Sequence, residues 1–185
     1  MKYWIAKLAF AIAGWKLDAS KEHIKAARNS VMIAAPHTSN WDTFYALAGF
    51  WLMRLPVRFF IKDFYTRWYF LGFFKALGAI GVDRSQRKNL VEYAAGLLKE
   101  DPNLVVLIAA EGTRSRVEKW KTGFYHIAKA ADVPISLGYL DYSKKTAGIL
   151  GVVPTGEKAT TFDTIQDLYA PIQGKFPELY NKQIH

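Results

Sequence analysis

Short apolar runs alternate along this chain with segments in which apolar residues recur every three or four positions. The runs are rich in valine and isoleucine and are bounded by turn residues, which is typical of strands buried on both faces of a sheet. We predict strands over residues 31–35, 57–61, 79–82, 103–110, 133–140 and 147–153.

The segments between these runs have the periodicity of helices. In NLVEYAAGLLKE, for example, the apolar side chains fall at helical spacing, and Pro102 follows the end of the segment. We predict helices over residues 41–54, 64–77, 88–100, 122–131 and 161–172. Strands that alternate with helices of this length predict an α/β fold, with a largely parallel central sheet flanked by helices.

The first residues, MKYWIAKLAFAIAGWK, are apolar but interrupted by Lys7. They fall short of the roughly 20 apolar residues that a membrane-spanning helix needs, and Lys7 divides what would be the apolar region of a signal peptide. We expect an N-terminal apolar helix that either faces a membrane, with Trp4 and Trp15 as interfacial anchors, or packs on the domain.

With 185 residues, of which 51% are hydrophobic and 22% charged, the chain is long enough to bury the core of one globular domain. We predict an N-terminal helical segment over residues 1–30 and a single α/β domain over residues 31–185. The absence of cysteine excludes disulfides, zinc fingers and a cysteine nucleophile, and it suits a reducing compartment.

The formal charge of +9 favours an anionic partner, which could be nucleic acid, a membrane surface or a phosphorylated substrate. Residues 54–88 carry eight lysines and arginines against Asp63 and Asp83, and aromatic residues are interspersed among them. The many phenylalanines and leucines favour lipid over stacked bases, and no nucleic-acid-binding motif is present. We therefore expect peripheral association with the cytoplasmic face of a membrane, through residues 1–17 and 64–77, and no nucleic acid.

His37 and Asp42 follow the first predicted strand in the stretch PHTSNWD. Positions i and i+5 of a helix lie about 140° apart, so the two side chains can pair only if His37 precedes the helix and Asp42 lies in its first turn. Ser39 and Asp42 fit a capping box, and helix capping is one reading of the stretch. The other is a catalytic pair, in which Asp42 orients the imidazole and His37 takes a proton from a hydroxyl. Because no G-x-S-x-G elbow is present, that hydroxyl would belong to the substrate.

Two further predicted strands end in basic sequences, VDRSQRK and EGTRSR. Ligands collect at the carboxyl ends of strands in open α/β sheets. There, Gly112 would let the backbone approach a ligand, and the guanidinium groups of Arg84 and Arg114 would match phosphate oxygens. The alternatives are a solvated charged loop and a surface pair of Arg84 with Asp83.

Neither a P-loop nor G-x-G-x-x-G is present, so ATP and NAD binding are not supported. The remaining histidines have no metal-ligand spacing, and we expect no metal site.

Four sequence blocks follow one another along the chain: HTSNWD, GVDRS preceded by FFIKD, EGTRSR followed by KWKTGFYHIA, and VPISLGY. Blocks of this kind occur in this order in the glycerolipid acyltransferase superfamily, and the chain resembles its members of the lysophosphatidic acid acyltransferase type. They span about residues 31 to 142. The chain departs from the family pattern at Ala110 and Leu137, where proline is usual.

The resemblance implies that His37 is the general base and Asp42 its orienting partner. It places the following residues at the substrate-binding site: Lys62, Arg84, Glu111, Gly112, Thr113 and Arg114. Pro134 matches the block-four proline, which is linked to donor binding or to structure.

The reaction implied is transfer of a fatty acyl chain from acyl-CoA or acyl-carrier protein to the hydroxyl of a glycerophosphate-type lysophospholipid. The acyl thioester is a co-substrate, and no cofactor is expected. Two alternatives stay open, a non-catalytic lipid- or membrane-binding protein and a hydrolase in which the same His37 activates water. The residues do not indicate an oligomeric state.

Overall fold

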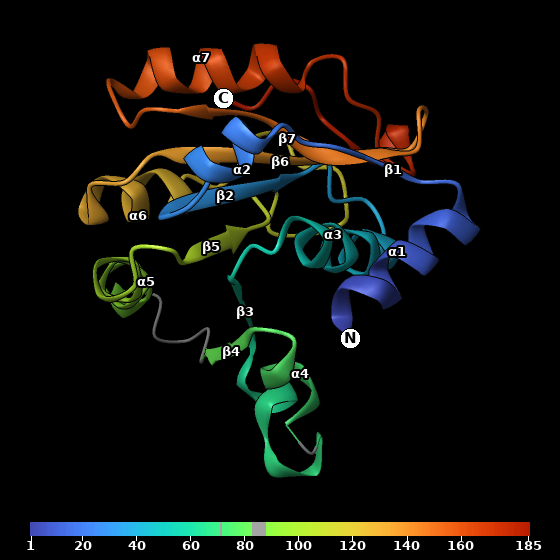
Figure 1. The fold of residues 1–185 in the computed structure, drawn as a ribbon. Coiled ribbons are helices and arrows are strands. Elements are labelled where there is room, and N and C mark those ends of the chain that lie inside the picture. The colour runs from blue at the N-terminus through green and yellow to red at the C-terminus, as the bar shows by residue number, and fades with distance from the viewer. Residues whose placement is uncertain (71, 83–87) are drawn as a thin grey trace.

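The computed structural model of the protein describes residues 1–70, 72–82 and 88–185, and it shows helices on both sides of a central sheet (Figure 1). Within these ranges the sheet has seven strands in the order β1-β7-β6-β2-β5-β3-β4. The strands are β1 (Lys16–Asp18), β2 (Ser30–Ala35), β3 (Val57–Lys62), β4 (Ala79–Val82), β5 (Val105–Ile108), β6 (Ile135–Asp141) and β7 (Thr146–Val153).

Most neighbouring strands of the sheet run parallel. Strands β2, β3, β4, β5 and β6 share one direction. Strand β7 is antiparallel to β6 because residues 142–145 are too few for a crossover, and β1 pairs with β7 in parallel. The arrangement confirms the predicted α/β domain with a largely parallel sheet flanked by helices.

Alternate residues of β2 belong to cores on opposite faces of the sheet, as the pleat of a strand requires. Val31 and Ile33 pack with side chains from α5, α6 and α7, whereas Met32 packs with side chains from α3. The α-helices of the described residues are α1 (Lys2–Ala13), α2 (Lys21–Ala26), α3 (Asn40–Met53), α4 (Phe73–Ala76), α5 (Lys88–Glu100), α6 (Gly123–Ala131) and α7 (Lys158–Tyr169).

The predicted helix over residues 64–77 is wrong. This segment holds two 3₁₀ turns, Asp63–Thr66 and Trp68–Phe70, followed by the short α4. Arg67 is extended and Gly72 has φ of 70°, and both conformations interrupt a helix. Bulky aromatic side chains also lose rotamer freedom in a helix, so the sequence has little intrinsic preference for one. The segment extends away from the rest of the fold (Figure 1).

Helix α1 buries one of its faces and exposes the other. Ala6 and Phe10 pack in a cluster that includes Ala48 of α3, while Trp4 is 67% exposed. Trp15 does not fit the predicted role of interfacial anchor, because it is buried and its ring stacks on Tyr45 at 4.5 Å. The cause is strand β1, which the sequence pattern did not predict: it pairs with β7 at the edge of the sheet and draws Trp15 into the fold.

Candidate active site

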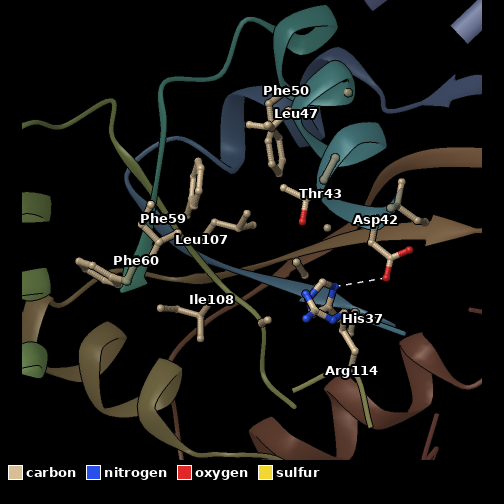
Figure 2. Close-up of a pocket in the computed structure, with 18 of the residues that line it drawn as sticks. His37, Asp42, Thr43, Leu47, Phe50, Phe59, Phe60, Leu107, Ile108 and Arg114 are labelled. Carbon is tan, nitrogen blue, oxygen red and sulfur yellow. Dashed lines mark ion pairs between the residues drawn. The ribbon is translucent and has the colours of Figure 1, made fainter. Parts of the chain in front are cut away.

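The side chains of His37 and Asp42 lie close together where the chain passes from β2 into α3. His37 lies in the turn before the helix, and Asp42 lies in its first turn, as their spacing requires. The His37 Nδ1 atom is 3.2 Å from Asp42 Oδ2 (Figure 2). The same carboxylate completes the capping box, since the Ser39 N–H donates to Asp42 Oδ2 at 2.8 Å. Helix capping and pairing with His37 are therefore performed together by one buried side chain.

The surroundings of Asp42 keep its carboxylate charged. Burial raises the pKa of this carboxyl, but hydrogen bonds from His37, Tyr142 and the Ser39 backbone outweigh burial and hold the pKa below its ordinary value. An ionised Asp42 accepts the proton of Nδ1, which sets the tautomer of the imidazole. In the neutral imidazole, Nε2 then carries no proton.

Glu111 supports the turn that carries His37. Strand β5 lies beside β2 and parallel to it, so the loop after β5 meets the turn after β2. There the His37 N–H donates to Glu111 Oε1 at 3.0 Å. The side chain of Glu111 is buried, and burial raises the pKa of its carboxyl despite the hydrogen bond from His37.

Gly112, the next residue, has a backbone conformation that favours glycine. Its φ of 68° lies in the left-handed region, which side chains disfavour. The side chain of Lys121 lies beside this part of the loop.

A cavity of about 900 Å³ adjoins the His–Asp pair, and His37 and Asp42 line it together with Arg114 (Figure 2). Away from the pair, a mainly apolar part of the wall comes from α3, β3 and β5. This part of the lining includes Thr43, Leu47, Phe50, Phe59, Phe60, Leu107 and Ile108. One cavity thus combines a basic nitrogen, a guanidinium and an apolar chamber.

Most of the predicted site residues meet at this cavity. His37, Asp42, Lys62, Gly112, Thr113 and Arg114 line it. Glu111 is only 3% exposed, and its contact is with the His37 backbone. Arg84 lies outside the described residues.

The cavity lining holds two cations, Lys62 and Arg114. In the described part of the chain, neither Lys62 nor Arg114 forms an ion pair. A free cation at a cavity wall is suited to an anionic ligand, and an arginine fork matches a phosphate.

Sequence reasoning missed Tyr142 and the apolar chamber. The Tyr142 hydroxyl donates to Asp42 Oδ1 at 2.6 Å from a position 100 residues further along the chain. No local pattern signals such a contact, which depends on the order of the strands. The chamber likewise combines side chains from three elements, and their apolar character alone predicts only burial.

A metal site is not evident in residues 1–70, 72–82 and 88–185, where no three His, Cys, Asp or Glu side chains are grouped so as to hold an ion. Nor does any helix in these ranges combine the length and apolar character needed to cross a membrane.

The family model described as Acyltransferase matches residues 17–136. Among solved structures, the chain is similar to the crystal structure of the 1-acyl-sn-glycerophosphate (LPA) acyltransferase, PlsC, from Thermotoga maritima, with a TM-score of 0.61 and 17% sequence identity. The match covers 92% of this chain and 75% of that chain, and at this identity it shows a shared fold. No curated protein matches the chain.

Proposed function

The chain belongs to the acyltransferase family, and from this premise we propose that it moves a fatty acyl chain from a thioester donor to the hydroxyl of a glycerophosphate-type lipid. One observation carries the proposal. The imidazole of His37, oriented by Asp42, lines the same cavity as an apolar chamber and Arg114, which forms no ion pair with any residue that the structure describes.

The reaction uses His37 first as a base and then as an acid. Nε2 takes the proton of the acceptor hydroxyl while the hydroxyl oxygen attacks the thioester carbonyl. The tetrahedral intermediate then expels the thiolate, which receives the proton back from His37, so the products are an ester and a free thiol. Asp42 holds the imidazole in place and stabilises its cationic form. No cofactor is needed besides the acyl-CoA or acyl-carrier-protein co-substrate.

The acceptor and the acyl chain occupy different parts of the cavity in this proposal. Arg114 and Lys62 bind the phosphate of a 1-acylglycerol-3-phosphate-like acceptor, since both are cations without an ion-pair partner among the described residues. The chamber between α3, β3 and β5 takes the acyl chain, because its wall is apolar. Its volume of about 900 Å³ lies within the usual range of ligand pockets.

We also propose that the protein binds the membrane peripherally, through α1 and the segment over residues 64–77. Four apolar side chains on one side of α1 face outward, namely Trp4, Ile5, Leu8 and Ile12. The other segment exposes further aromatic side chains, among them Trp68 and Phe73.

A hydrogen bond between the two segments supports a single lipid-facing surface. Lys2 Nζ of α1 donates to the Ala76 carbonyl oxygen at the end of α4, at 2.8 Å. Lys7 and Arg67 lie over aromatic rings of these segments. Cations beside exposed aromatic residues favour anionic headgroups, which are abundant in the cytoplasmic leaflet.

Thiol release from palmitoyl-CoA, followed with and without lysophosphatidic acid, tests the acyl transfer. We expect release by the wild type that depends on the acceptor, loss of release in His37→Ala, and retention in the matched control His126→Ala, whose histidine is on α6. If release needs no acceptor and yields free fatty acid, the protein is a hydrolase. If neither palmitoyl-CoA nor a palmitoyl carrier protein releases thiol, acyl transfer is refuted and a lipid-binding role remains.

A further inference from the structure

Asp42 has two carboxylate oxygens, and they have different partners. Oδ2 faces His37 Nδ1 and accepts from the N–H groups of Thr38 and Ser39, both at 2.8 Å. Among the described residues, Oδ1 has one hydrogen-bond partner, the hydroxyl of Tyr142 at 2.6 Å. The other partners of the carboxylate, His37, Thr38 and Ser39, lie in the turn that Asp42 itself caps, so among the residues described Tyr142 is the partner that ties it to another part of the fold.

Tyr142 is held independently of that turn. It follows β6, and its N–H donates to the Gln173 carbonyl oxygen at 2.9 Å. Its ring meets Trp15 edge-on, with centroids 5.0 Å apart, and Trp15 in turn stacks on Tyr45. The hydroxyl therefore approaches Asp42 from a fixed direction, through a ring packed by residues outside the cap.

Rotation of the Asp42 carboxylate about its Cβ–Cγ bond would move Oδ2 away from His37. The hydrogen bond from the Tyr142 hydroxyl to Oδ1, at 2.6 Å, opposes that rotation. Hydrogen bonds to a charged acceptor are about twice as strong as neutral ones. Burial and the neighbouring Asp42 also raise the pKa of the Tyr142 hydroxyl well above its ordinary value, so it stays protonated and donates.

We propose that Tyr142 is a positioning residue of the His37–Asp42 pair, holding the carboxylate in the orientation that presents Oδ2 to the imidazole. This role rests on the proposed acyl transfer for its effect on rate, but the contact itself can be tested without catalysis. Tyr142 lies outside residues 17–136, which the family model matches, so the inference concerns a feature of this chain beyond that match.

Tyr142→Phe tests the role because it removes the hydroxyl and keeps both the ring and the backbone N–H. The matched control is Tyr125→Phe, since the Tyr125 hydroxyl also makes one hydrogen bond, to the Gly156 carbonyl oxygen at 2.9 Å, and lies on α6 outside the cavity lining. We expect Tyr142→Phe to lower kcat by about 10- to 100-fold, as fits loss of a hydrogen bond to a charged group. KM for both substrates should stay within about threefold, whereas Tyr125→Phe should keep kcat.

The Nδ1 proton of His37, observed by NMR in histidine-labelled protein, gives a second measurement that needs no substrate. We expect its resonance to shift or broaden in Tyr142→Phe and to keep its position in Tyr125→Phe. A normal kcat in Tyr142→Phe overturns the proposal, and so does a reduced kcat with an unchanged Nδ1 resonance. If the wild type transfers no acyl group at all, the proposed function fails, and the NMR comparison alone decides whether Tyr142 orients the pair.

Discussion

The backbone of His37 is tied to the side chain of Glu111, since the His37 N–H donates to Glu111 Oε1 at 3.0 Å across a separation of 74 residues. The bond joins the turn after β2 to the loop after β5. The resemblance to acyltransferases assigned Glu111 to acceptor binding, but its carboxyl is buried and engaged with the backbone of the base. In this structure, Glu111 is placed to fix the position of His37.

Replacement of Glu111 separates hydrogen bonding from charge. Glu111→Gln keeps a side-chain oxygen that can accept from His37, whereas Glu111→Ala removes it and leaves the half-buried His37 N–H without this acceptor. We expect Glu111→Ala to lower kcat by at least about tenfold and Glu111→Gln to stay within a few-fold of the wild type. Steady-state assays of thiol release measure both, and equal losses in the two variants would show that the charge matters instead.

The stability of the protein should respond to pH through Glu111. Burial raises the pKa of its carboxyl above the ordinary 4.5, so the folded state binds this proton more tightly than the unfolded chain does. The resulting stabilisation is complete below pH 4.5 and is lost as the pH rises through the folded-state pKa. Glu111→Gln has no such group. As the pH rises above 4.5, the unfolding free energy of the wild type should therefore fall relative to that of Glu111→Gln, by at most about 1.4 kcal/mol per pH unit.

Urea unfolding of the two proteins between pH 4 and pH 9 measures this difference. Parallel pH profiles for the wild type and Glu111→Gln would contradict the raised pKa.

Local contacts of the site could be predicted from the sequence, and contacts between distant segments could not. His37, Ser39 and Asp42 lie within six positions, so the sequence predicted the capping box, and helix geometry showed where His37 must lie for the pair to form. Glu111 was found through a motif, but its bond to the His37 backbone depends on β5 lying beside β2. Tyr142 had no signal of either kind, because it reaches Asp42 only through the pairing of β6 with β2.

The errors in the fold have a similar cause. The three residues of strand β1 are all exposed, so no alternation of apolar and polar residues indicates a strand there. The strand forms because its backbone pairs with β7 at the edge of the sheet. Over residues 64–77, the sequence pattern predicted a helix. Several of these side chains are exposed instead, so burial does not stabilise a helix there.

Arg114 should control the preference for a phosphorylated acceptor. Arg114→Ala removes a cation from the cavity wall, and we expect kcat/KM for 1-acylglycerol-3-phosphate to fall about 10- to 100-fold, the usual effect of losing a charged hydrogen bond. The activity toward monoacylglycerol, which lacks the phosphate, should change little. The control is Arg116→Ala, because Arg116 is exposed and donates to the Glu178 carbonyl oxygen. Equal losses of kcat/KM with both acceptors would show that Arg114 does not act by binding the phosphate of the acceptor.

Filling the apolar chamber should shorten the acyl chain that the protein accepts. Leu47 lies on α3 and lines the chamber, and Leu47→Trp adds volume there without adding charge. We expect the ratio of kcat/KM for palmitoyl-CoA to that for octanoyl-CoA to fall by at least about fivefold, since overpacking costs about 1–3 kcal/mol. The octanoyl donor serves as the internal control for folding. An unchanged ratio would place the acyl chain elsewhere.

The exposed side of α1 should provide much of the affinity for membranes. Trp4, Leu8 and Ile12 are 67%, 62% and 79% exposed, so alanine at these positions removes little packing within the fold. Each large apolar side chain contributes up to about 1.5–3 kcal/mol when it becomes fully buried. We expect the triple variant to bind vesicles containing anionic lipid at least about 100-fold more weakly in sedimentation assays, with its thermal unfolding unchanged. Tyr93→Ala, at an exposed aromatic residue of α5, should bind like the wild type. If the triple variant binds as tightly as the wild type, the segment over residues 64–77 must supply the contact without α1.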